Sequence, residues 1–242
     1  TTEVALAKID GQDIEFLTSG IGPTTGIKGT LQNISGVFMS LKNALEKVGM
    51  DYSDLAKEVS QQYFDDEIVS CQINESFVDA GAFDGATSVE FAKWAKKGYE
   101  KIVIYEPMKE NIVNVEHTVR NLKNVEIHNK ALWNKKELLQ FSFDGAGSSI
   151  DKNGVTVEAE PLDPDSKVTF VKMDIEGAEM NALEGMKSII MEQKPKLAIC
   201  IYHLYDDLWN IPKYIHELVP EYKLYMRHYS KINEETVIYA IL

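Results

Sequence analysis

The sequence predicts an α/β fold in which a doubly wound, mostly parallel β-sheet carries helices on both faces. From Phe77 onward, short apolar runs that suit buried strands alternate with segments whose apolar residues recur at helical spacing. The first of these strands leads through a glycine turn into a helix, which is how a parallel strand–helix–strand unit begins. Close to the C-terminus, two strand-like runs are joined by a link, 230–235, that only a hairpin suits.

Composition and charge limit the class of protein. The 242 residues are 44% hydrophobic and 26% charged, so we expect one large domain or a domain with an extension. A formal net charge of −13 argues against a nucleic-acid partner and against an anionic membrane surface, since both attract clustered Lys and Arg. No apolar run reaches membrane-spanning length and no signal peptide is visible, so a cytoplasmic location is expected.

Residues 1–70 are expected to form a mostly helical extension that packs on a main domain of residues 71–242. Apolar residues over 31–48 follow helical spacing, with Gly49 placed to end that helix. A second helix is predicted over 54–64.

The main domain begins with a strand that ends at Val78, followed by a turn that contains Gly81 and Gly85 and by a helix over 86–97. Glycine suits such a turn because a Cβ would block the bend or the close approach of a ligand. Backbone N–H groups and the helix N-terminus would then surround a small pocket.

The later elements alternate in the same way. Strands are predicted at 101–105, 125–128, 168–173 and 197–202, and helices around 112–122, 179–192 and 207–218. Two extra strands, 138–143 and 155–158, are joined by a glycine-rich turn, and the strands 222–227 and 236–241 form the closing hairpin.

Glu106 follows the second strand, 25 residues after Gly81. In nucleoside sites an acid at this place accepts hydrogen bonds from ribose hydroxyls, although the dipole of the following helix would favour an acid there in any case. The turn lacks the middle glycine that lets backbone approach a pyrophosphate, since Ala82 and Phe83 follow Gly81. Together with the acid Asp79, this favours a positively charged ligand without phosphate, and S-adenosylmethionine fits that description.

Three stretches, 78–85, 105–107 and above all 170–179 with its Asp-Ile-Glu-Gly-Ala-Glu run, resemble the FkbM family of S-adenosylmethionine-dependent methyltransferases. The resemblance covers about 65–242. It implies the Rossmann-like class I methyltransferase fold, a seven-stranded sheet whose last strand is antiparallel, in agreement with the predicted order of elements.

By the same resemblance, the cofactor is S-adenosylmethionine. Its methionine part would lie against Asp79, Gly81 and Gly85, its ribose against Glu106, and its adenine against 129–131. The complete set of cofactor residues that this implies is Asp79, Gly81, Ala82, Gly85, Glu106, Pro107, Asn129, Lys130 and Ala131.

Candidate catalytic residues follow the fourth and fifth core strands: Asp174, Glu176 and His203. Methyl transfer depends on alignment of nucleophile, methyl and sulfur, and a general base helps a hydroxyl nucleophile. Glu176 and its neighbour Glu179 suit helix N-terminal capping equally well, and His203 suits a structural role. No His, Cys, Asp or Glu residues have metal-ligand spacing along the chain, so no metal is expected.

The sequence therefore predicts an S-adenosylmethionine-dependent methyltransferase that methylates a hydroxyl of a small molecule or saccharide. Two alternatives stay open. An NAD-dependent oxidoreductase is disfavoured by the missing middle glycine and the closing hairpin, and a non-catalytic binding module by the acids Glu106, Asp174 and Glu176. The cofactor motifs name neither the acceptor nor the oligomeric state, because acceptor pockets are built from loops and extensions.

Overall fold

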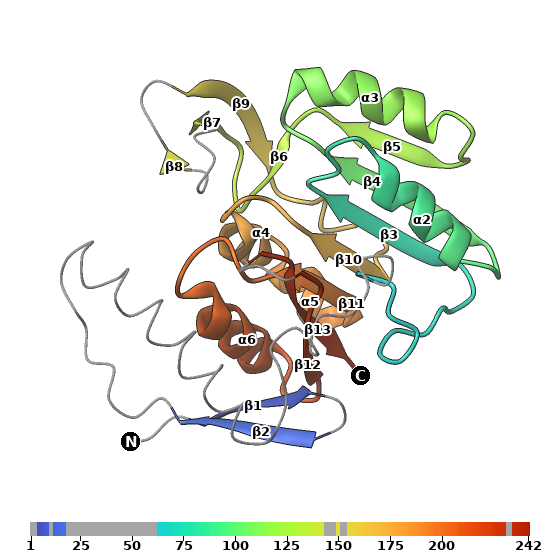
Figure 1. The fold of residues 1–242 in the computed structure, drawn as a ribbon. Helices are drawn as coiled ribbons and strands as arrows, with labels where there is room; N and C mark the ends of the chain where they lie inside the picture. The colour runs from blue at the N-terminus through green and yellow to red at the C-terminus, as the bar shows by residue number, and fades with distance from the viewer. Residues whose placement is uncertain (1–3, 10–11, 18–61, 143–148, 151–153, 231–233) are drawn as a thin grey trace.

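The computed structural model describes residues 4–9, 12–17, 62–142, 149–150, 154–230 and 234–242 (Figure 1). Its strands are β1 (Val4–Ile9), β2 (Gln12–Leu17), β3 (Glu75–Ala80), β4 (Tyr99–Tyr105), β5 (Val125–His128), β6 (Ala131–Leu132), β7 (Glu137–Ser142), β8 (Ser149–Ile150), β9 (Val155–Glu160), β10 (Phe170–Met173), β11 (Lys196–Cys200), β12 (Lys223–His228) and β13 (Thr236–Ile241). Its helices are α2 (Ala86–Trp94), α3 (Lys109–Val119), α4 (Glu179–Gly185), α5 (Lys187–Gln193) and α6 (Asp207–Leu218).

The main sheet has the strand order β2-β1-β12-β13-β11-β10-β3-β4-β5. From β12 to β5 it contains seven strands, of which β13 alone runs antiparallel to its neighbours. The doubly wound, mostly parallel sheet and its C-terminal hairpin are thereby confirmed. Because β13 is inserted between β11 and β12, the short link after β12 returns the chain directly into the sheet.

The N-terminal segment adds two strands to this sheet. β1 and β2 form an antiparallel hairpin, and β1 joins the edge strand β12 in parallel. The helix predicted over 31–48 lies outside the described residues, as does the helix predicted over 54–64 except for 62–64, which are not helical.

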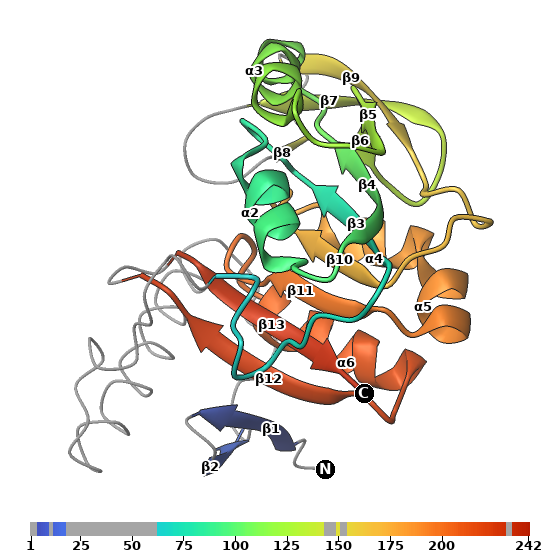
Figure 2. The same ribbon diagram turned by 90° about the vertical axis from the view of Figure 1, so that its right-hand side faces the viewer.

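Helices cover both faces of the sheet, α2 and α3 on one face and α4, α5 and α6 on the other (Figure 2). Successive strand residues point to opposite faces, so adjacent positions of β3 supply two different cores. Phe77 stacks on Phe91 of α2, with ring centroids 4.2 Å apart. Val78 belongs to the other core, together with Leu183 of α4 and Ile211 of α6.

The long helix expected at 179–192 is divided at Met186 into α4 and α5. Gly185 ends α4 at a place where an added Cβ would lie 2.2 Å from the Trp133 carbonyl oxygen. The glycine is therefore explained by the close approach of the chain that follows β6.

The two extra strands correspond to β7 and β9 and belong to a smaller sheet of order β6-β9-β7-β8. The turn predicted between them lies outside the described residues. The longest described helix, α6, has 12 residues, and within the described part of the chain no helix combines the length and apolarity needed to cross a membrane.

Candidate functional site

The glycine turn after β3 is shaped mainly by the chain that packs against it. Gly81 has a φ of +77°, and its N–H donates to the Tyr105 carbonyl. A Cβ on Gly81 would lie 1.8 Å from the carbonyl oxygen of Asp174, and one on Gly85 would lie 3.2 Å from Val119 of α3. Gly81 is thus required by close backbone packing, and Gly85 by its φ of +82° together with a tight contact with α3, whether or not a ligand also approaches them.

Asp79 has a partner that the sequence did not indicate. Its carboxylate is fully buried, accepts a hydrogen bond from Ser88 (2.7 Å) and lies 3.2 Å from the ammonium of Lys172. Lys172 is equally buried and donates to the Ala80 and Gly81 carbonyls at 3.2 and 2.6 Å. Burial alone would lower the pKa of Lys172, but Asp79 raises it. The positive charge facing Asp79 is therefore the chain's own lysine. Asp79 supports the turn through Lys172, whose ammonium donates to the Ala80 and Gly81 carbonyls.

Glu106 is 4% exposed and fastens the turn to the following helix. Its Oε1 accepts from the Met108 N–H and the Asn111 amide, and its Oε2 accepts from the Phe83 N–H at 2.9 Å. A carboxylate has about four acceptor sites. Among the described residues Oε2 receives this single hydrogen bond, so it keeps capacity for a further donor.

The segment 129–131 is attached to the same place. The Asn129 amide donates to the carbonyls of Glu106 and Pro107, both at 3.0 Å, and the Lys130 ammonium lies 2.6 Å from Glu160. Ala82 and Ala131, the two small members of the predicted cofactor set, are 3% and 6% exposed. The fold thus brings all of the predicted cofactor residues to the C-terminal ends of β3, β4 and β5.

Asp174 follows β10 and is surrounded by donors. Tyr63 and Tyr202 donate to its two carboxylate oxygens at 2.9 and 3.2 Å, and the His203 imidazole lies 3.3 Å away. Burial raises the pKa of Asp174, but His203 and Lys172 outweigh burial and hold this pKa well below the usual range. Asp174 is therefore a weak base, better suited to orienting its neighbours than to accepting a proton.

His203, whose side chain is 4% exposed, lies among three carboxylates. Its Nδ1 lies 2.9 Å from Glu179, and its Nε2 lies 3.3 Å from Asp174 and 3.7 Å from Glu176. The ring nitrogens have no contact with hydrogen-bond geometry, so these are ion-pair contacts. Burial would lower the pKa of His203, but Asp174 and Glu179 raise it to about 10.

The two glutamates differ in their surroundings. Glu179 is fully buried in the first turn of α4 and accepts a hydrogen bond from the N–H of Ile175, which precedes the helix, so it holds the preceding loop and does not cap α4 through a side-chain hydrogen bond. Glu176 has a φ of +58° and a side chain that is 60% exposed. Partial burial raises the pKa of Glu176, with Asp174 and Glu179 adding to the rise and His203 opposing it, and Glu176 is the most exposed acid of the group.

Two contributors were missed by sequence reasoning. Lys172 could have been noticed, because a lysine inside the apolar strand of residues 168–173 requires a buried partner. Tyr63 gave no signal, since it comes from a bend in the predicted extension and reaches Asp174 from 111 positions away.

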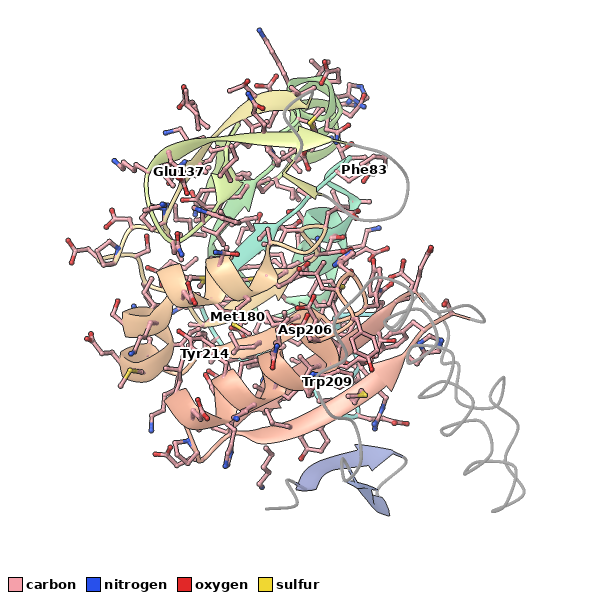
Figure 3. The ribbon with its side chains drawn as sticks, turned by 90° about the vertical axis from the view of Figure 1, so that its left-hand side faces the viewer. Phe83, Glu137, Met180, Asp206, Trp209 and Tyr214 are labelled. Atoms are coloured by element: carbon pink, nitrogen blue, oxygen red, sulfur yellow. The ribbon has the colours of Figure 1, made fainter. Side chains whose placement is uncertain are left out.

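Figure 3 shows Trp209 on α6. The Trp209 ring packs edge-on against Tyr205, with ring centroids 4.9 Å apart.

The expectation that no metal is bound stays a prediction, but the structure brings together a donor set that the sequence did not indicate. Asp174, Glu179 and His203 each offer a ligand atom, and these atoms lie within 4.8 Å of one another. The spacing along the chain did not indicate this donor set, because its members follow two different strands that only the sheet makes neighbours.

The strand order and the position of this site define the class. A seven-stranded, doubly wound sheet with its last strand inserted antiparallel, and with polar residues at the carboxyl ends of its central strands, is the class I methyltransferase fold. The family model described as "Methyltransferase FkbM domain" matches residues 79–231, and the chain belongs to this family.

Solved structures include a similar protein, the methyltransferase FkbM from Methylobacillus flagellatus KT, with a TM-score of 0.69 and 27% identity. That likeness covers 78% of this chain and 49% of the other, so the chain spans about half the length of that protein. Aeropyrum pernix fibrillarin with bound S-adenosyl-L-methionine is a more distant structure, with a TM-score of 0.42, 11% identity and coverage of 70% and 67% of the two chains.

A curated protein matches a shorter stretch. The large subunit of the propanediol dehydratase-reactivating factor of Citrobacter freundii is 42% identical over 57 residues, which are 23% of this chain and 9% of that protein.

Proposed function

We propose that this protein is an S-adenosylmethionine-dependent methyltransferase. The observation that carries the proposal is the carboxylate of Glu106, which lies at the end of β4 beside the glycine turn and keeps acceptor capacity on Oε2. A ribose hydroxyl is the donor that an acid in this place receives in nucleoside sites. Membership of the FkbM methyltransferase family supports the same reading.

The residues present fit this cofactor. Glu106 would hold the ribose, the backbone from Gly81 to Gly85 would enclose the methionine part, and 129–131 would line the adenine side. Asp79 would act through Lys172 on the carbonyls of the turn, since its carboxylate is buried. S-adenosylmethionine supplies an activated methyl group, so the chain's contribution is chiefly alignment.

The acceptor in this proposal is a hydroxyl group of a small molecule or saccharide. Asp174, Glu176 and His203 follow β10 and β11, next to β3 in the sheet, so they face the acceptor side of the turn. The net charge of −13 disfavours a nucleic-acid acceptor, because phosphates would be repelled. Within this set, Glu176 is the base best placed to receive a hydroxyl proton, and Asp174 orients Tyr63, Tyr202 and His203.

A thermal scan with S-adenosylhomocysteine tests the cofactor assignment. At about a hundred times its dissociation constant the ligand should stabilise the fold by about 2.7 kcal/mol. For a chain of this size that corresponds to a rise in Tm of roughly 5 to 10 °C. NAD at equal concentration should give no shift. A shift with NAD and none with S-adenosylhomocysteine would overturn the proposal in favour of an oxidoreductase.

A further inference from the structure

We propose that Phe83 is a further cofactor-binding residue whose aromatic ring packs against the ribose of S-adenosylmethionine, a role that rests on the proposed function. Figure 3 shows Phe83 on the turn between β3 and α2. The sequence indicated Phe83 only as a residue at which the turn departs from the dinucleotide pattern, and it is not among the cofactor residues that the family resemblance implies.

The backbone of Phe83 lies beside the place where Glu106 would hold the ribose. The Phe83 N–H donates to the Oε2 atom of Glu106 at 2.9 Å, and this oxygen keeps capacity for a further donor. A ribose hydroxyl that donates to the same oxygen at about 2.7 Å would lie within roughly 5.6 Å of the Phe83 nitrogen. This distance is short enough for the phenyl ring of the same residue to contact the sugar.

The ring of Phe83 differs from its surroundings in exposure. Phe83 is 68% exposed, whereas Ala82 beside it is 3% exposed and Glu106 is 4% exposed. A ribose presents apolar C–H groups between its hydroxyls, and an aromatic ring that covers them removes apolar area from water on both partners. The turn therefore offers one large apolar surface to a ligand that Glu106 fixes by its hydroxyls.

Exposed apolar side chains are common on proteins, so the backbone conformation of Phe83 is a needed second observation. Its φ is +52°, in the left-handed region that residues other than glycine and asparagine rarely adopt. Elsewhere in the described part of the chain, Asn74 and Asn124 are asparagines and Lys194 ends α5, so their positive φ values have local explanations. The remaining non-glycine residues with positive φ lie, like Phe83, at the carboxyl ends of the parallel strands: Tyr63, Glu176 and Glu235.

Strained backbone conformations gather at ligand sites, where the side chain they present is used. A glycine or an asparagine would adopt the Phe83 conformation with less strain. The presence of a phenylalanine at this position is therefore explained by contact between its ring and a ligand, and the ribose beside Glu106 is the nearest candidate.

The same position of Phe83 favours a nucleoside ligand without phosphate. A pyrophosphate needs backbone N–H groups of the turn that are free to face it and a glycine that lets it approach. The Phe83 N–H is already donated to Glu106, and the residue carries a large side chain. Phe83 thus accounts in structural terms for a preference for S-adenosylmethionine over NAD.

The experiment is calorimetric titration of the purified full chain and its Phe83 variants with S-adenosylhomocysteine. Phe83→Asn removes the ring, keeps the N–H that Glu106 accepts and suits a positive φ. We expect its dissociation constant to rise by about tenfold. The Tm of the ligand-free Phe83→Asn chain should be equal to that of the wild type or higher, since the backbone strain is reduced. Phe83→Tyr keeps the ring and should retain the affinity within about twofold.

Ile73 gives a matched control, because it is 70% exposed and precedes β3 at the end opposite to the turn. Ile73→Asn should leave the affinity for S-adenosylhomocysteine unchanged. Hydroxyl-radical footprinting of the wild type compares the two residues directly. The ligand should roughly halve the oxidation of Phe83 or lower it further, because its ring becomes covered, and leave the oxidation of Ile73 unchanged.

The outcomes separate this role from the proposed function. If the wild type binds S-adenosylhomocysteine, but Phe83→Asn binds it equally well and Phe83 is not protected, the role of Phe83 is wrong and the methyltransferase proposal stands. If Phe83→Asn loses affinity and Tm together while Phe83 stays unprotected, the ring supports the turn and does not contact the cofactor. Absence of binding by the wild type would overturn the proposed function and the role of Phe83 with it.

Discussion

The two sides of the candidate site are built in different ways. The cofactor side is built around a continuous turn, residues 79–85, whose backbone N–H groups and carbonyls contact Tyr105, Glu106 and Lys172. The acceptor side gathers Tyr63, the pair Asp174 and Glu179, and His203 from three separate segments through side-chain contacts. A local turn is readable as a sequence pattern, whereas an assembled cluster exists only once the sheet has formed.

Lys172 joins the two sides, and its removal should produce the largest effect. Lys172→Met leaves the buried carboxylate of Asp79 without its cation, which should cost about 3 to 5 kcal/mol of unfolding free energy. Denaturant titration measures this loss, and the double variant with Asp79→Asn should recover a large part of it. Lys101→Met is the control: it removes an exposed ion pair between Lys101 on β4 and Glu126 on β5, and it should cost at most about 1 kcal/mol of unfolding free energy. Equal losses for the two lysines would show that the turn does not depend on the buried pair.

Gly81→Ala tests whether the turn is dictated by packing. An alanine there meets the Asp174 carbonyl at 1.8 Å and must keep a φ of +77°, so we expect a loss of about 2 to 4 kcal/mol. Gly98 is the matched control, because its φ of +86° is similar and an added Cβ meets nothing within 4 Å. Gly98→Ala should cost only about 1 to 2 kcal/mol. If denaturant curves show equal losses for the two variants, the backbone conformation, and not the contact with the Asp174 carbonyl, is the cause.

Glu106→Gln isolates the function of the cofactor side. Loss of the charged acceptor should weaken S-adenosylhomocysteine binding by about 1.5 to 3 kcal/mol, measured by calorimetry. Glu126→Gln changes an acid on the neighbouring strand β5 and should leave that affinity unchanged. An unaltered dissociation constant in Glu106→Gln would withdraw the ribose assignment and leave Glu106 only as the residue that fastens the turn.

Tyr63→Phe should give the smallest effect, and it concerns the acceptor side. Removal of its hydrogen bond to Asp174 should cost about 1 kcal/mol. Tyr222→Phe removes a comparable buried hydrogen bond, to the Pro195 carbonyl at 2.5 Å, away from the site. In double-mutant cycles with Asp174→Asn, Tyr63 should couple by more than about 0.5 kcal/mol and Tyr222 should not. Additivity for both would mean that the predicted extension does not hold the cluster together.

The helix boundaries show how far local patterns reach. α6 and the strands β5 and β13 begin and end where the sequence indicates, because an amphipathic stripe, an alternation of apolar and polar residues, or a short apolar run defines each one. The division of the predicted 179–192 helix at Met186 was not visible, since its cause includes the Trp133 carbonyl from a distant segment. The hairpin of β1 and β2 was missed for a similar reason, as β1 pairs with β12 near the other end of the chain.

The sequence by itself determined the sheet, the glycine turn and the acid after β4, because each depends on residues that are neighbours along the chain. Tertiary structure decided what these residues do. It paired Asp79 with a buried lysine, and it set His203 among Asp174, Glu176 and Glu179. Parallel strands bring residues that are distant in sequence to one edge, and the charges that meet there fix the protonation and partners of every group.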